Sequence, residues 1–216
     1  VSYSDMPLTH SAAAFDSMLF DSTGATATGS VHDYYQWASG GQLNVVGEVV
    51  GVVHADSARA YYGFNSWGLS WTSTPRNACG LVREALDSCA AQVNWSDYDL
   101  NGDGYVDMLW VVHAGIGGEA SADHNDLWSV TSSLTSWSHS TSFVTTDLVP
   151  GSTTRYIRIN RFTMLPELSP FHAGGISEIG VYCHEFGHAL GLPDLYDVRD
   201  GGRINIGPGC WSLMGS

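Results

Sequence analysis

The stretch that most constrains this chain runs from Val181 to Asp194 and contains the motif His184-Glu185-Phe186-Gly187-His188. Residues four apart lie on one face of a helix, so both imidazoles can converge on a single metal ion. Glu185 follows the first histidine and is close enough to act on a water molecule at that ion. Gly191 and Pro193 predict the end of the helix, because glycine tolerates the left-handed turn after a helix and proline cannot continue one.

The spacing of this motif is typical of zinc peptidases, in which the two histidines bind the ion and Glu185 is the general base. A catalytic zinc normally takes three protein ligands and keeps one position for water. No His or Glu follows His188, so a downstream third ligand must be an Asp or a Cys. The candidates are Asp194, Asp197, Asp200 and Cys210. We expect Asp194, because the chain can double back after the helix, and we take Asp197 as the second choice.

A second motif covers residues 97–107 and predicts a calcium loop. Its oxygen-bearing side chains alternate along the chain, as hard cations prefer, and a glycine permits the sharp turn between them. The first, third, fifth, sixth, seventh and ninth positions are Asp99, Asn101, Asp103, Gly104, Tyr105 and Asp107. The twelfth position is Trp110 rather than the usual Glu. We therefore expect a calcium loop completed by other ligands rather than a helix–loop–helix site, with a solvated acidic turn as the alternative.

A polar loop from Gly117 to Asp126 offers two interpretations. It carries Glu119, Asp123, His124 and Asp126. These side chains could form a second ion site or the polar rim of a cleft, and we favour the rim.

The charge of the chain limits its partners. The 22 acidic residues outnumber 8 basic residues, and the net charge of −14 argues against nucleic acid or anionic membranes as partners. No apolar run is long enough to span a membrane. The composition fits an extracellular protein that binds calcium.

The cysteines favour disulfides without fixing their pairing. Cys79, Cys89, Cys183 and Cys210 allow two bridges in three connectivities. Bridges would indicate an oxidising compartment, and free thiols are the alternative. Cys79 and Cys89 lie in one predicted helix, which would hold them roughly 15 Å apart, beyond the reach of a disulfide.

Hydrophobic patterning predicts a mixture of helices and strands. We expect helices at residues 10–20, 31–38 (with Ser30 as the N-cap) and 77–93, and an active-site helix whose buried stripe is Ile176, Ile179, Cys183, Phe186 and Leu190. We expect strands at residues 1–7, 108–113, within 128–146, and at 156–161, and one long strand or a hairpin at residues 42–55. Residues 61–74 and 162–175 read as loops. This is an α+β pattern, a mixed twisted sheet with a backing helix and an active-site helix.

The last residues complete the pattern. Met214 lies in a predicted tight turn after the histidine helix, which is the arrangement of the Met-turn beneath the metal of metzincins. In that pattern the third ligand stands three residues beyond the glycine, where this chain has Asp194. The chain resembles the immune inhibitor A family of secreted bacterial metallopeptidases. The resemblance rests on residues 29–35, 41–49, 101–107, 113–115, 184–197 and 211–214.

This resemblance implies a metzincin-like zinc endopeptidase domain that binds calcium, is made as a precursor with its own pro-segment, and is exported. We expect one catalytic domain over residues 1–216, with an upper part to about residue 191 and a short lower part from 192, shortened at both ends relative to the family. We expect a monomer that acts on proteins or peptides. The alternatives are a calcium-stabilised binding domain without activity, which the intact Glu185 argues against, and a zinc peptidase whose third ligand is a downstream Glu, which this chain lacks.

Overall fold

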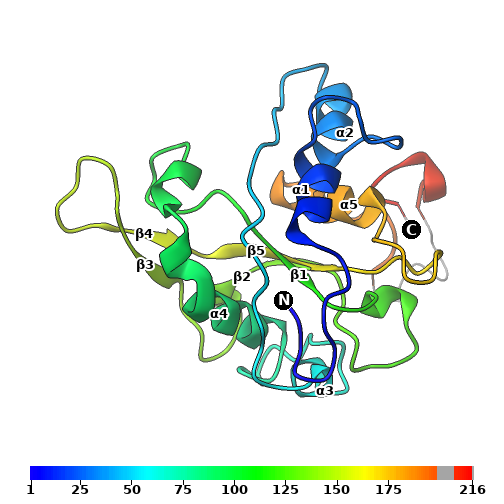
Figure 1. The fold of residues 1–216 in the computed structure, drawn as a ribbon, viewed down its shortest axis with the longest axis horizontal. Coiled ribbons are helices and arrows are strands. Elements are labelled where there is room, and N and C mark those ends of the chain that lie inside the picture. The colour runs from blue at the N-terminus through cyan, green and yellow to red at the C-terminus, as the bar shows by residue number, and fades with distance from the viewer. Residues whose placement is uncertain (199–206, 216) are drawn as a thin grey trace. The chain divides into compact units, whose positions relative to one another are not determined.

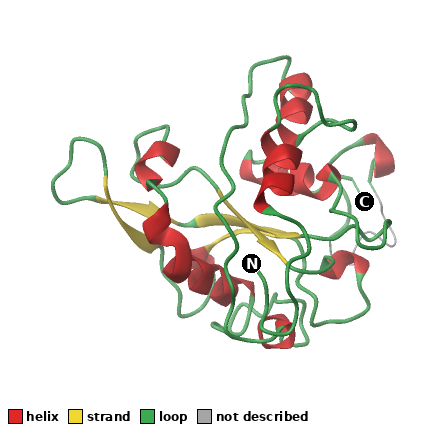
Figure 2. Cartoon of the chain, viewed as in Figure 1, coloured by secondary structure: helices red, strands yellow, loops and turns green. Residues whose placement is uncertain are grey.

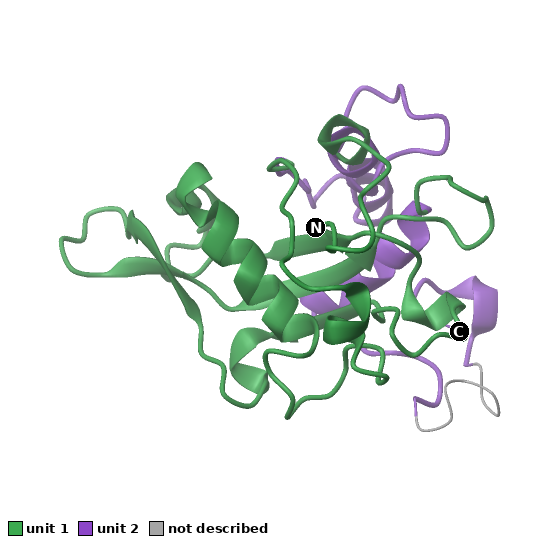
Figure 3. Ribbon diagram, turned by 60° about the horizontal axis from the view of Figure 1, so that its bottom comes forward, with its two compact units in different colours: residues 1–15, 49–177 green, residues 16–48, 178–216 purple. Residues whose placement is uncertain are grey.

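The computed structural model describes residues 1–198 and 207–215, and these form two compact units. Unit 1 consists of residues 1–15 and 49–177, and unit 2 of residues 16–48 and 178–216 (Figure 3). Helix α1, Ala12–Phe20, crosses from the first unit into the second. The expectation of a single domain stays a prediction, and each unit is described by itself.

The described elements give the α+β composition that the sequence predicts (Figures 1 and 2). The helices after α1 are α2 Val31–Ala38, α3 Arg59–Gly63, α4 Ala78–Cys89 and α5 Ile179–Ala189. The strands are β1 Leu109–His113, β2 Val130–Ser133, β3 Phe143–Leu148, β4 Tyr156–Ile159 and β5 Arg161–Pro166. Short 3₁₀ turns cover Ala90–Gln92, Trp95–Tyr98, Gly118–Ala120, Leu134–Ser136 and Gly209–Trp211.

The main sheet of unit 1 has the strand order β1-β5-β2. Strand β1 pairs in parallel with β5, with Leu109 opposite Phe162, and β2 pairs antiparallel with β5, with Val130 opposite Met164. Residues 162–166 of the central strand β5 are all buried. A strand that is covered on both faces loses the alternation by which strands are recognised. This is why the expected loop at residues 162–175 was wrong for its first part.

A second sheet pairs β3 with β4 in antiparallel fashion, with Phe143 opposite Ile159. Strands β2 and β3 together account for much of the expected strand region at 128–146, and β4 lies within the strand expected at 156–161. The core of unit 1 packs α4 against side chains of these strands. Its fully buried members include Leu81, Val82, Leu127, Leu134, Ile157, Ile159, Phe162 and Met164.

Two expected strands are absent from the described structure. Residues 42–55 form no strand and contribute only an isolated bridge between His54 and Ser2. Residues 1–7 make only isolated bridges as well. The 42–55 segment has the valines of a strand but no neighbouring strand to pair with, and Val46 remains 62% exposed. Strand propensity alone does not create a sheet when no partner satisfies the backbone.

Three helices match the sequence predictions closely, and one was missed. Helix α2 has the predicted bounds, and its N-cap Ser30 forms a capping box with Asp33. Helix α4 begins after Asn77, whose side chain accepts a hydrogen bond from the Gly80 amide at 2.9 Å. Helix α1 lies within the range expected for it. Helix α3 was not predicted. It begins two residues before the aromatic loop expected at residues 61–74 and extends into it.

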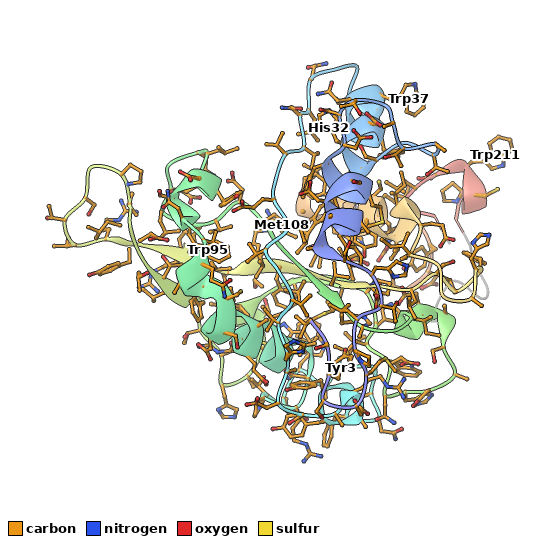
Figure 4. All side chains as sticks on the ribbon, in the orientation of Figure 1. Tyr3, His32, Trp37, Trp95, Met108 and Trp211 are labelled. Carbon is orange, nitrogen blue, oxygen red and sulfur yellow. The ribbon has the colours of Figure 1, made fainter. Side chains whose placement is uncertain are left out.

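Unit 2 is built on the contact between α2 and α5. The Tyr35 hydroxyl of α2 donates a hydrogen bond of 2.6 Å to the Cys183 carbonyl oxygen of α5. The Tyr35 ring also meets the Phe186 ring edge-on, with centroids 5.1 Å apart. Trp37 of α2 instead projects outward with 81% of its surface exposed (Figure 4). The buried hydroxyl and ring of Tyr35 therefore fix the helix that carries the histidine motif.

None of the described helices is long and apolar enough to cross a membrane.

Candidate metal centre

Helix α5 carries the histidine motif and ends where the sequence predicts. The Gly191 amide closes the helix by donating to the His188 carbonyl oxygen at 3.0 Å, and Gly191 has a positive φ of 92°. The buried side of the helix differs from the predicted stripe. Tyr182, Cys183 and Glu185 are buried, whereas Leu190, which the stripe included, is exposed.

Both histidines are oriented by backbone carbonyl groups. His184 Nδ1 lies 2.9 Å from the Leu213 oxygen, and His188 Nδ1 lies 2.8 Å from the Leu192 oxygen. A carbonyl oxygen can only accept a hydrogen bond, so each neutral ring carries its proton on Nδ1. Each Nε2 therefore presents a lone pair, which is the form of imidazole that binds metals.

Asp194 directs an oxygen atom at these two lone pairs. Its Oδ1 lies 3.2 Å from His184 Nε2 and 3.4 Å from His188 Nε2. This oxygen is buried and makes no hydrogen bond. With both rings in the neutral form, three acceptor atoms face one another, and a cation at their centre would stabilise this arrangement.

Glu185 lies beside the same group. Ligand-type atoms of His184, Glu185 and His188 lie within 4.8 Å of one another, and no other such group of three occurs among the residues that the structure describes. The Glu185 side chain is buried. The buried carboxylate is therefore close to the two imidazoles, as a general base would need to be.

Tyr196 is a site residue that the sequence reasoning missed. Burial raises the pKa of Tyr196 to about 12, and the negative charges of Asp194 and Glu185 raise it further in the same direction. The phenol is a protonated donor at neutral pH. The only sequence signal was its place two residues after Asp194.

Met214 lies against the helix at Gly187. A Cβ atom at position 187 would lie 2.8 Å from the Met214 sulfur, so only glycine allows this approach. The segment around Asp194 is tied to the same turn, because the Leu195 amide donates to the Met214 carbonyl oxygen at 2.8 Å. Trp211, just before the turn, projects outward and is 92% exposed (Figure 4).

Of the remaining candidates for the third ligand, Asp197 is half-buried and Cys210 is exposed, and Asp200 lies outside the described residues.

The expected disulfides are absent, because Cys79, Cys89, Cys183 and Cys210 are all free. Cys79 and Cys89 lie at opposite ends of α4, the separation that argued against their pairing. Burial raises the pKa of the Cys183 thiol to about 12, so this group behaves as an apolar side chain.

The acidic loop of unit 1 is held by its own backbone amides. Asp99 Oδ2 accepts from the Gly104 amide at 2.9 Å, Asn101 Oδ1 from the Asp103 amide at 2.8 Å, and Asp103 Oδ1 from the Tyr105 amide at 2.8 Å. Asp107 Oδ2 accepts from the Leu100 amide at 3.2 Å. Asp99 is only 8% exposed, and its Oδ1 is buried without a hydrogen-bond partner. This oxygen is the only buried polar side-chain atom of residues 97–107 without a hydrogen-bond partner.

An arginine of α3 forms ion pairs with two carboxylates of the polar loop at residues 117–126. Arg59 pairs with Asp126, and its Nη2 lies 2.8 Å from Asp123 Oδ2. Glu119 accepts hydrogen bonds from the amide and hydroxyl of Ser129 at 3.0 and 2.7 Å. Each of the three carboxylates therefore has a partner within the protein. The loop does not support the second ion site, which was one of the two interpretations of its sequence.

Comparison with known proteins places the chain in a class. Residues 5–216 match the family described as immune inhibitor A peptidase M6, catalytic domain. The match covers nearly the whole chain, and the chain belongs to this family.

Individual relatives agree with that class. The chain is 33% identical over 229 residues to the pre-pro-metalloprotease PrtV of Vibrio cholerae serotype O1, in two strains, covering 94% of this chain and 23% of the relative. It is 28% identical over 186 residues to immune inhibitor A of Bacillus thuringiensis subsp. alesti, covering 76% of this chain and 25% of the relative. The chain spans about a quarter of the length of these curated relatives, and we class it as a metalloendopeptidase domain.

Proposed function

We propose that this domain is a zinc endopeptidase, in which His184, His188 and Asp194 hold the ion. The single observation that supports this ligand set is that Asp194 Oδ1 lies 3.2 Å from His184 Nε2 and 3.4 Å from His188 Nε2. Two imidazoles and a carboxylate are a donor set that zinc takes in catalytic sites.

The proposed reaction is the hydrolysis of a peptide bond by water. Bound zinc would supply a Lewis acid that polarises the scissile carbonyl and lowers the pKa of water. Glu185 takes the proton from the attacking water and delivers it to the amine that leaves. Burial keeps the Glu185 carboxylate away from bulk water, so the proton passes within the site. Met214 is proposed as the floor beneath the ligands, equivalent to the Met-turn of metzincins.

Three further parts of the proposal concern the chain outside this centre. Calcium binds the loop at Asp99, Asn101, Asp103, Tyr105 and Asp107 as a structural ion. The support is the buried Asp99 Oδ1, which has no donor.

The chain acts as one catalytic domain, a monomer, on protein or peptide substrates. It is exported and made with a pro-segment, in line with a relative named as a pre-pro-metalloprotease.

The test is a comparison of Glu185→Gln with Glu48→Gln. Glu48 belongs to the same unit and is exposed, so it provides a matched loss of charge outside the site. We expect Glu185→Gln to keep its zinc and lose at least about 100-fold in casein cleavage, the lower range for a general base. Glu48→Gln should cleave casein as the wild type does. A chelator should abolish casein cleavage by the wild type and by Glu48→Gln.

Retention of more than a tenth of wild-type turnover by Glu185→Gln would overturn its assignment as the base. A wild-type protein that carries zinc but cleaves no protein would favour the binding domain without activity.

A further inference from the structure

One arginine lies directly against the acidic loop of unit 1. Arg155 Nη2 donates a hydrogen bond of 3.0 Å to the Asp103 carbonyl oxygen. A Cβ atom at position 104 would lie 2.8 Å from the same nitrogen, so the guanidinium packs over Gly104. Residues 97–107 carry four carboxylates and no basic side chain. Arg155 therefore brings a positive charge to the rim of a loop that has none of its own.

The backbone that carries Arg155 is fixed beside the loop. The Arg155 amide donates to Ser152 Oγ at 2.9 Å, and the Arg155 carbonyl oxygen accepts from the Val149 amide at 2.9 Å. Three residues further on, in β4, the Arg158 amide donates to the Gly104 carbonyl oxygen at 2.9 Å. These bonds involve no loop carboxylate, so they hold Arg155 in place whether or not the loop contains an ion.

The guanidinium is close to the carboxylate that supports the proposed calcium site. Asp99 is 8% exposed, and its Oδ1 is buried without a hydrogen-bond partner. Its Oδ2 accepts from the amide of Gly104, the residue over which Arg155 packs, at 2.9 Å. A calcium ion bound by Asp99 would therefore lie near the guanidinium, and two positive charges repel each other.

We propose that Arg155 is the counter-cation of this loop, which stabilises the calcium-free loop and weakens its binding of calcium. The inference rests on the proposed calcium site and names the residue that sets its affinity. An interaction that favours the calcium-free state over the calcium-bound state reduces calcium affinity by the same free energy.

The experiment is a calorimetric titration with calcium in low-salt buffer, on protein stripped of metal and restored with zinc. Arg155→Gln removes the charge and should bind calcium about 3- to 10-fold more tightly, the size expected for repulsion between a divalent ion and one charge across several ångströms of water. Arg155→Lys keeps the charge and should bind calcium as the wild type does.

Arg83→Gln is the matched control. Arg83 of α4 lies in the same unit, and its Nη1 also donates to a backbone carbonyl oxygen, that of Thr141, at 2.7 Å. This variant loses the same charge and the same kind of hydrogen bond, and it should keep wild-type calcium affinity.

Two further measurements separate a charge effect from a general structural role. The gain in calcium affinity of Arg155→Gln should shrink as KCl is raised to about 1 M, where the Debye length falls to about 3 Å. In the absence of calcium, Arg155→Gln should melt at a lower temperature than the wild type, because four carboxylates then lack their counter-cation.

Calcium affinity of Arg155→Gln equal to or below that of the wild type would overturn the inference. An equal gain in Arg155→Lys, or a gain that persists in 1 M KCl, would also overturn it, since charge would not then be the cause. Failure of the calcium site itself is distinguishable, because the wild-type protein and Arg155→Gln would both bind no calcium in the same titration.

Discussion

The histidine motif of unit 2 and the acidic loop of unit 1 are both predicted metal sites, but their donor atoms are used differently. In unit 2, backbone carbonyl groups bind the Nδ1 atoms of His184 and His188 and leave both Nε2 atoms available. In the loop, the side-chain oxygens of Asp99, Asn101 and Asp103 accept hydrogen bonds from backbone amides of the loop itself.

The difference follows from the chemistry of the donors. An imidazole has two nitrogen atoms, so one can be anchored while the other binds an ion. A carboxylate in a loop can satisfy the nearby amides with the same oxygens that a cation would need. Backbone contacts therefore orient both imidazoles of the motif without using their Nε2 atoms. The side chains of the acidic loop instead bind the loop's own amides, and Asp99 Oδ1 is their one buried oxygen without a partner.

The largest effect is expected from a substitution at the proposed zinc site of unit 2. Asp194→Ala removes the oxygen that faces both histidines and should weaken zinc binding by more than the 10- to 100-fold typical of an outer partner. Asp197→Ala, the other candidate, should have the smaller effect. Chelator competition on the metal-stripped variants measures both. Wild-type zinc affinity in Asp194→Ala together with a loss in Asp197→Ala would identify Asp197 as the ligand.

A smaller effect is expected from the acidic loop. Calcium at about 100 times its dissociation constant stabilises the native state by about 2.7 kcal/mol. For a protein of this size that raises Tm by roughly 5–10 °C. Asp99→Asn should abolish most of this rise, because it alters the buried oxygen, whereas Asp97→Asn at the exposed neighbouring position should keep it. The rise is measured in protein stripped of metal and restored with zinc, and a melting temperature that ignores calcium would eliminate the loop as a calcium site.

The smallest effect is expected from His113, a buried histidine of unit 1 that lies outside the histidine motif. Burial lowers the pKa of His113 from 6.5 to about 4, so the folded state keeps it neutral while the unfolded chain becomes protonated. The native state is then fully favoured above pH 6.5 and loses stability as the pH falls toward 4. Between pH 7 and pH 5 this should cost about 2 kcal/mol.

Urea unfolding of the metal-stripped protein measures that loss. His113→Asn should flatten the dependence on pH, and His139→Asn, an exposed position, should leave it unchanged. An equally steep dependence in His113→Asn would assign the acid sensitivity to other groups.

Features that depend on short-range geometry could be predicted from the order of the residues alone. The i, i+4 spacing of His184 and His188 places both rings on one face of any helix, and Gly191 ends that helix. The Ser30 cap sets the start of α2 in the same way. The acidic loop could be recognised because alternating oxygens around Gly104 are a local pattern.

Features that depend on residues distant in the chain could not be predicted before the folded structure was known. Strand β5 has no alternation because other elements cover both its faces, while the valines of residues 42–55 remain without a strand partner. The tautomers of His184 and His188 depend on carbonyl groups of Leu213 and Leu192, and the approach of Asp194 to both rings depends on the chain that follows the helix. Such contacts are selected by packing rather than by spacing, because a hydrogen bond forms only where the folded backbone brings donor and acceptor within about 3 Å.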